Sequence, residues 1–178
     1  MDYDQEGPFY KSKIDRETQW IESVDLGDNT VQTLDSNPAD PASASGLLAT
    51  GLDTFAFSLS KDNGEHTNVT GFDKLTGETV VIDGVTLERT EYEYTETADD
   101  GTILRQSRGN EYILQEPRTF IAGTSEWWDG ENWMPMDGHP VDFAFPGDKG
   151  FEATQPIFDC DAVMSQLSDE KDLIHDTL

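Results

Sequence analysis

Carboxylates are the side chains with chemical potential that this chain offers in the greatest number. The 178 residues include 37 Asp and Glu against 11 Lys and Arg, which gives a formal net charge of −26. Paired carboxylates perform general acid–base catalysis, and glycoside hydrolysis is the best-known case. With so many acids, pairs at any sequence spacing arise by chance. A carboxylate-based hydrolase therefore stays an open alternative that spacing alone does not favour.

The motifs that resemble metal sites are incomplete. The opening stretch DYDQEG has the spacing of a calcium-binding EF-hand loop that begins at Asp2, but the bidentate acid required at position twelve is replaced by Lys13. The three histidines and the single cysteine show no paired spacing of the kind that zinc sites use. We therefore expect no metal site and no cofactor.

Nucleophile and phosphate motifs are equally incomplete. GLLATGLD, from Gly46, has the glycine spacing of a phosphate-binding loop but carries Leu52 and Asp53 where Lys and Ser or Thr are needed. The chain has no Gly-x-Ser-x-Gly nucleophile elbow. Cys160 lies between two aspartates, whose charge disfavours a thiolate, so we interpret it as a buried structural thiol. We expect no catalytic residue and no enzyme activity.

Aromatic side chains are the remaining candidates for binding. The stretch SEWWDGENWMPM places Trp127, Trp128 and Trp133 around an Asp-Gly turn. Rigid indoles beside acids can stack on a sugar or an apolar group, but they can equally form the core of a hairpin. The choice between these interpretations depends on the strands that carry them.

The charge limits the classes of partner. A net charge of −26 repels phosphate backbones and anionic lipid surfaces, so we expect neither nucleic-acid binding nor membrane insertion. No apolar run is long enough to span a membrane, and the first residues do not form a signal peptide. The acidic, polar composition favours an exported protein, periplasmic or extracellular, whose own export signal is absent from this sequence.

The pattern of apolar residues predicts an all-β fold. We expect a polar N-terminal arm or linker over residues 1–45, an antiparallel β domain over 46–160 and a C-terminal helix over 161–178. Within the β domain, short alternating runs such as DTFAFSLS and VDFAFPG are separated by turn residues. About eight such strands suit an up-and-down meander that forms a lipocalin-like barrel or a two-layer sandwich. This likeness depends on strand number alone.

Strand registers follow from the turn residues. A two-residue turn at Asp100 and Gly101 places Glu96 opposite Arg105, Glu93 opposite Arg108 and Tyr92 opposite Gly109. Further turns through QEPR and DGEN predict four more cross-strand pairs: Tyr112–Ile121, Gln106–Trp127, Trp127–Met134 and Trp128–Trp133.

Because side chains alternate across a sheet, these registers divide the apolar residues between two faces. The face that we interpret as core carries Val85, Leu87, Tyr112, Leu114, Ile121, Trp127, Met134 and Met136. The second face carries our candidate binding residues, which are Trp128, Trp133, Phe120, Tyr92 and Tyr94. Either the N-terminal arm or C-terminal helix covers this second face, or a ligand does. A β-bulge would change the division.

The function expected from these observations is non-catalytic. We expect an acidic, exported β-protein that binds a small ligand or a protein partner. A structural subunit of a larger assembly, such as a virion or cell-surface structure, is the alternative, and with it an oligomeric state. A carboxylate-based hydrolase is the third hypothesis, which a cavity lined by convergent acids would favour.

Overall fold

The computed structural model describes residues 1–4 and 7–153 of the chain. These residues form one antiparallel sheet of ten strands and one short helix, α1 (Ala44–Thr50). The strands follow one another in the sheet in the order of the sequence: β1 (Asp2–Asp4), β2 (Gly7–Ile14), β3 (Trp20–Asp25), β4 (Val31–Leu34), β5 (Leu52–Lys61), β6 (His66–Ile82), β7 (Val85–Ala98), β8 (Ile103–Leu114), β9 (Thr119–Trp128) and β10 (Trp133–Asp137).

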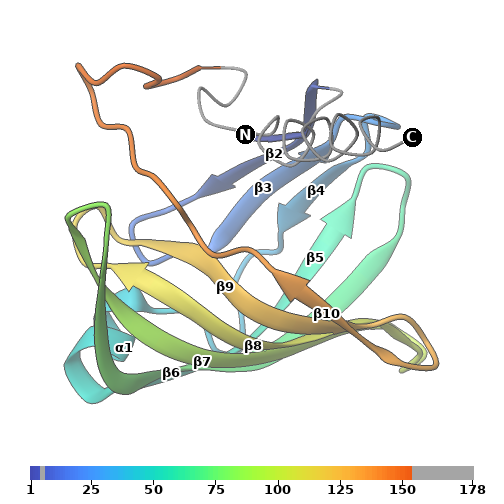
Figure 1. Cartoon of the computed structure of the whole chain (residues 1–178). Helices are drawn as coiled ribbons and strands as arrows, with labels where there is room; N and C mark the ends of the chain where they lie inside the picture. Colours follow the sequence, from blue (N-terminus) through green and yellow to red (C-terminus); the bar gives the residue numbers. More distant parts are fainter. Residues whose placement is uncertain (5–6, 154–178) are drawn as a thin grey trace, which may run out of the picture.

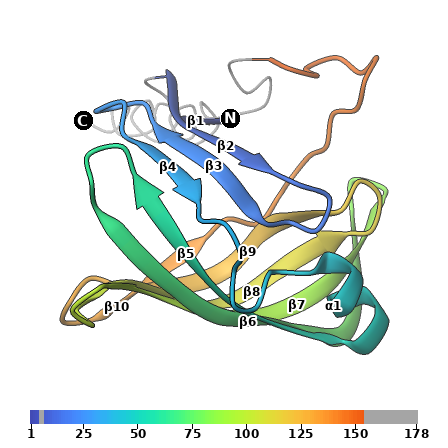
Figure 2. The same cartoon turned by 180° about the vertical axis from the view of Figure 1, so that it is seen from behind.

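The sheet curls into a half-barrel. Figures 1 and 2 show β2, β3 and β4 folding over the concave side of the longer strands β5 to β9. Each strand pairs with its neighbours in sequence, and within the described residues no pairing joins β10 to β1. The expected all-β antiparallel meander is confirmed, and its shape is a curled half-barrel.

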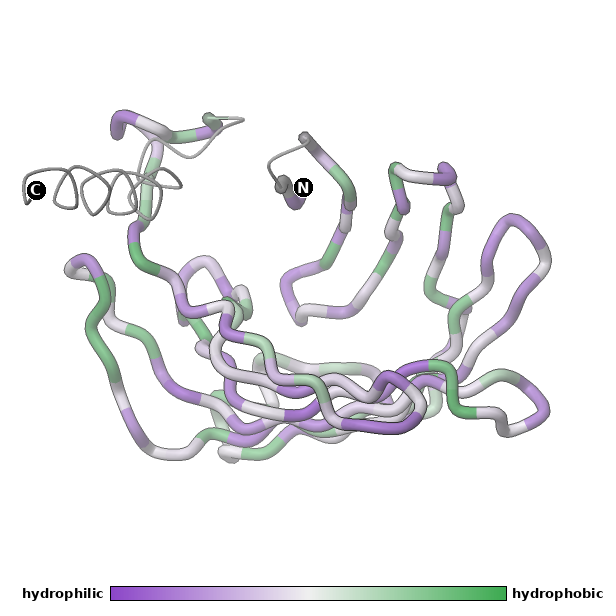
Figure 3. Tube along the Cα trace, turned by 45° about the vertical axis from the view of Figure 1, so that its right-hand side comes forward, coloured by the Kyte–Doolittle hydropathy of each residue, from purple (hydrophilic) through white to green (hydrophobic). Residues whose placement is uncertain are grey.

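The concave side, which we call the inner face, carries the larger core cluster. Phe55, Phe57 and Leu59 alternate along β5 and pack with Val69 of β6, while Tyr94 of β7 lies against them. Period-two alternation places these side chains on one face, as the sequence predicted for β5. Hydrophilic and hydrophobic residues alternate along the strands in Figure 3. The opposite side of the sheet is called the outer face below.

Helix α1 closes one end of the concave space. Ser43 is its N-cap and accepts a hydrogen bond from the backbone N–H of Gly46, and Gly51 ends the helix in the left-handed conformation. Leu47 is fully buried and packs with Ile113 of β8, beside the partly buried Leu75 and Phe120. The helix therefore forms an apolar floor for the half-barrel.

The N-terminal region differs from the expected irregular arm. Residues 1–45 contribute four strands to the sheet, and the longest described segment of this region without regular structure lies between β4 and α1. These strands carry few apolar residues and most of their described side chains stay at least partly exposed, so their hydrophobic pattern was too weak to predict strands. Residues 141–147, expected as a strand, form none. The helix expected over 161–178 lies outside the described residues.

The register between β7 and β8 is confirmed, but its turn is different. Glu96 pairs with Arg105, and the pairs Glu93–Arg108 and Tyr92–Gly109 follow. The loop has three residues and ends at Gly101, whose positive φ of 85° suits glycine. Leu104 then forms a bulge, because Thr97 pairs with Ile103. The longer loop and the bulge cancel, which restores the predicted register.

A second bulge changes the faces of β9. Tyr112 pairs with Ile121 as predicted, but Gly123 and Thr124 together lie opposite Asn110, and Trp127 pairs with Ser107 instead of Gln106. The predicted pairs Trp127–Met134 and Trp128–Trp133 are confirmed.

The prediction that Trp127 belongs to the core is wrong. Its side chain lies at the end of the sheet and is 44% exposed, while Met134 and Met136 beside it are also exposed. Of the predicted core face, Leu87 and Tyr112 are buried. The bulge moves the end of β9 by one residue relative to β8, and a one-residue shift exchanges the faces of every later side chain.

Candidate ligand-binding site

A cavity of about 300 Å³ lies on the inner face, between Thr18 and Trp20 of the N-terminal region and the strands β5 to β10. Half of its lining residues are aromatic: Trp20, Phe55, Phe57, Tyr92, Tyr94 and Phe120. A concave apolar space with a small number of polar groups is the usual form of a small-molecule site. The cavity is therefore the principal candidate site.

Two carboxyl groups project into this cavity. Asp73 on β6 pairs with Tyr92 on β7, which in turn pairs with Gly109 on β8. Glu111 is two residues beyond Gly109 and so lies on the same face, and both acids line the cavity. Strand register thus brings together two acids that are far apart in the sequence.

The two carboxyl groups lack counter-charges. In the part of the chain that the structure describes, neither Asp73 nor Glu111 accepts a side-chain hydrogen bond or pairs with a lysine or arginine. Thr90, directly opposite Glu111, is fully buried, and its Oγ1 also has no partner among those residues. In contrast, the Tyr92 hydroxyl lies 2.8 Å from Oγ of Ser107. Asp73 and Glu111 are partly buried, whereas the Thr90 hydroxyl is a fully buried polar group without a partner, which is uncommon.

Burial of these acids shifts their protonation. Withdrawal from solvent, with a smaller contribution from the neighbouring Asp53, raises the pKa of Asp73 to about 7. Withdrawal from solvent and the charge of Asp73 raise the pKa of Glu111 to about 8. Both groups therefore exchange protons near neutral pH, which ordinary surface carboxyls do not.

A network of hydrogen bonds around Glu17 joins the segments beside the start of α1. Its carboxylate accepts hydrogen bonds from the Ser45 hydroxyl at 2.7 Å and from Arg118 at 2.8 Å, and the Ser45 hydrogen bonds are the main reason that the pKa of Glu17 is lowered. Asp53 accepts a hydrogen bond from the Ser43 N–H at 2.8 Å. The loop before β3, the start of α1 and the turn after β8 are thereby joined.

Trp20 closes the aromatic wall from the N-terminal side. Its ring makes edge contacts with Phe57 and Tyr94 at centroid distances of 5.3 and 5.7 Å. A second inner cavity, of about 290 Å³, shares Trp20 and Tyr94 and is lined further by Glu96 and Arg105. Trp20 therefore lies between the two inner cavities.

The predicted site residues are divided between the two faces. Tyr92, Tyr94 and Phe120 line the inner cavity, on the face that we expected the N-terminal arm, the C-terminal helix or a ligand to cover. Trp20 of the N-terminal region does contact Tyr94. Trp128 and Trp133 form a pair with ring centroids 5.6 Å apart, but the bulge in β9 places them on the outer face.

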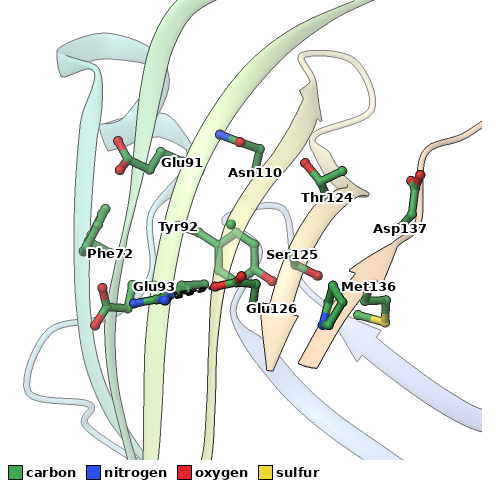
Figure 4. Close-up of a pocket in the computed structure, with 13 residues that line it drawn as sticks. Phe72, Glu91, Tyr92, Glu93, Asn110, Thr124, Ser125, Glu126, Met136 and Asp137 are labelled. Atoms are coloured by element: carbon green, nitrogen blue, oxygen red, sulfur yellow. Dashed lines mark hydrogen bonds and ion pairs between the residues drawn. The ribbon is translucent and has the colours of Figure 1, made fainter. Parts of the chain in front are cut away.

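The outer face carries a wider groove of about 750 Å³, which Figure 4 shows. Arg108 lies along it, bonded to Glu126 at 3.0 Å and stacked on Trp133 at 4.0 Å from the ring centroid. Since Arg108 covers one face of Trp133, that face is not free to stack on a ligand. The groove has its own counter-charge, unlike the inner cavity.

Asp73, Glu111 and Trp20 were not among the predicted site residues. Asp73 is one of 37 acids, and nothing in its neighbouring residues marks it as buried. The one available signal was register: the predicted pair Tyr92–Gly109 puts Glu111 on the Tyr92 face, where a carboxylate among aromatic residues is unexpected.

Comparison of the chain with protein-family models, with curated proteins and with solved structures found no significant match. Among residues 1–4 and 7–153, no group of three or more His, Cys, Asp and Glu side chains is arranged to hold a metal ion. The one helix in that part of the chain is too short to cross a membrane.

Proposed function

We propose that this chain is a small-molecule-binding protein whose ligand occupies the inner cavity. The observation that carries the proposal is an aromatic cavity that contains two carboxyl groups, Asp73 and Glu111, with no partner in the described residues. A bound ligand would supply the missing partners. We liken this arrangement to a lipocalin-like barrel, in which a curled antiparallel sheet surrounds one small ligand.

The same two acids favour a second candidate, the carboxylate-based hydrolase. A general acid and a general base work best when their pKa values lie close to the working pH, and the pKa values of Asp73 and Glu111 lie near 7 and 8. Half of the lining residues of the cavity, however, are aromatic and suit retention of a largely apolar ligand. We therefore place binding first and treat turnover of a bound ligand as the distinguishing observation.

Titration with N-phenyl-1-naphthylamine, a neutral probe that fluoresces in apolar sites, tests the proposal. We expect saturable enhancement of fluorescence with the wild-type protein. Ala42 lines the cavity and is buried, so Ala42→Phe fills part of the space and should weaken binding at least tenfold. Thr70→Phe, on an exposed outer-face position of β6, is the matched control and should leave binding unchanged.

Circular dichroism of each variant establishes that it folds. Binding that is absent in the wild type, or that is equal in folded Ala42→Phe and Thr70→Phe, would overturn the proposal. The structural-subunit alternative predicts a large assembly in a solution mass measurement, whereas a binding protein of this size can act as a monomer. Conversion of a bound ester or glycoside to product would favour the hydrolase.

A further inference from the structure

The inner cavity is asymmetric in charge. Its lining residues with polar side-chain groups are Asp73, Glu111, Thr18, Ser107, Tyr92, Tyr94 and Trp20, and no lysine or arginine is among the described residues that line it. An anionic ligand would find no positively charged side chain among these lining residues. A neutral ligand would leave the two acids without a counter-charge once they ionise.

The aromatic rings of the cavity favour a positively charged ligand. The face of an aromatic ring carries negative electrostatic potential, so cations bind over Trp, Tyr and Phe rings, and more strongly when water is excluded. Trp20, Tyr92 and Tyr94 contribute such rings beside the two acids. The net charge of −26 also raises the local concentration of cations at the protein surface.

We propose that the ligand is a hydrophobic organic cation, an arylalkylamine whose ammonium group lies between Asp73 and Glu111 while its ring packs against Trp20 and Tyr94. The inference rests on the proposed function, because it names the ligand class of the same cavity. A volume of about 300 Å³ lies at the lower end of the range for small-molecule sites, which suits one ring system with a short side chain.

Proton release is a specific consequence of such binding. Around the pair, the titratable groups are Asp53 from β5 and Tyr92 and Tyr94 from β7, and burial raises the pKa of all three. An incoming ammonium favours the ionised forms of Asp73 and Glu111, which are largely protonated below about pH 7 to 8. Binding at pH 7 should therefore release protons, and the release should decrease towards pH 9.

Tryptamine and tryptophol form a matched pair of probes, since they share a ring and chain and differ in an ammonium against a hydroxyl group. Isothermal titration calorimetry at pH 7, in two buffers of different ionisation enthalpy, measures both affinity and proton release. We expect tryptamine to bind at least tenfold more tightly than tryptophol, with protons released. The double variant Asp73→Asn, Glu111→Gln should abolish this preference and the release.

Non-specific attraction to an acidic protein is controlled by a second double variant, Glu93→Gln, Glu131→Gln, which removes two exposed carboxylates outside the cavity. It should keep the preference for tryptamine. Equal affinities of the wild type for the two probes, absent proton release, or loss of the preference in the Glu93, Glu131 variant would each overturn the amine assignment. If N-phenyl-1-naphthylamine still binds the cavity in that case, the proposed binding function stands and only the ligand class is wrong.

Discussion

Asp73 and Glu111 couple the stability of the fold to pH. Their pKa values of about 7 and 8 lie above the values near 4 expected for unfolded chains. Between about pH 4 and pH 8 the folded state therefore binds more protons than the unfolded state. By linkage, the free energy of unfolding falls as the pH rises through this window.

Replacement of both acids by their amides should remove this dependence. We expect Asp73→Asn with Glu111→Gln to be more stable than the wild type at pH 9, by on the order of 1 to 3 kcal/mol, and close to it at pH 4. Urea unfolding at the two pH values measures the difference. His66, whose pKa is raised by hydrogen bonds to Asp99 and Asp35, is present in both proteins and cancels in the comparison. A stability gap that is the same at both pH values would contradict the assignment of partly buried carboxyls with raised pKa values.

Replacement of the tryptophans of the last hairpin by alanine should lower stability in a different order from the one that the sequence register predicts. The sequence register implies a loss of about 3 to 5 kcal/mol for Trp127→Ala, as for a core indole. Because the Trp127 side chain is 44% exposed, we now expect about 1.5 kcal/mol or less. Trp133→Ala loses the contacts with Trp128 and Arg108 and should cost about 1 to 2 kcal/mol. Thermal unfolding of the two variants gives the order, and a much larger loss for Trp127→Ala would support the original register.

At the scale of elements, Glu17 holds three segments together through one carboxylate. Ser45 at the start of α1 and Arg118 in the turn before β9 both donate to it, and Arg118 also donates to the Ser45 hydroxyl. Hydrogen bonds to a charged acceptor are stronger than those between neutral groups, and the loss of the acceptor leaves its donors unpaired. The floor formed by Leu47 of α1 therefore depends on a residue in a loop far from it in sequence.

Glu17→Gln should loosen this end of the half-barrel. We expect a loss of about 1 to 3 kcal/mol in the free energy of unfolding at pH 7, because Gln offers a single weaker acceptor. Since the pKa of Glu17 is lowered, its contribution is present at neutral pH and is lost as the pH falls through that pKa. Glu131→Gln, in the exposed loop before β10, is the matched control. Equal melting temperatures for the two variants would show that the network is not stabilising.

Elements with strong alternation and clear turns were predictable from sequence, and irregular ones were not. β5 and the β7–β8 register follow from alternation and opposite-charge pairs, which are local properties. The bulge at Gly123 and Thr124 has no comparable local signal. A Cβ at Gly109, whose φ is 154°, would lie 2.4 Å from the Thr124 carbonyl oxygen, so glycine is required there; this reason is visible only once β9 is in place.

The aromatic part of the candidate site could be predicted from strand register, and the rest could not. Tyr92, Tyr94 and Phe120 were placed together by register, and they do line one cavity. No local feature distinguished Asp73 and Glu111 from the many other acidic residues of the chain. Trp20 reaches the cavity only because the whole sheet curls. Long-range curvature depends on twist accumulated over many strands, which short sequence windows do not encode.

At the scale of the whole molecule, charge should make stability depend on ionic strength. A net charge of −26 on one small domain repels itself in the compact state, and salt screens this repulsion. We expect the melting temperature to rise as NaCl increases from about 10 mM to about 1 M, a range over which the screening length falls from about 30 to about 3 Å. Sucrose at matched osmolarity is the control. A melting temperature that does not change with salt would mean that the acids are compensated locally.

The linear strand order has a consequence for how the chain folds. Nearly all pairing joins strands adjacent in sequence, so each hairpin can form with little loop-closure entropy, and β5 to β9 can assemble one strand at a time. The contact of Trp20 with Tyr94 is different, because it closes a long stretch of chain. We expect β3 to dock late and to exchange its amide hydrogens sooner than β7. The cavity would then exist only after this docking, and the capacity to hold a ligand would be the last property gained in folding and the first lost on partial opening.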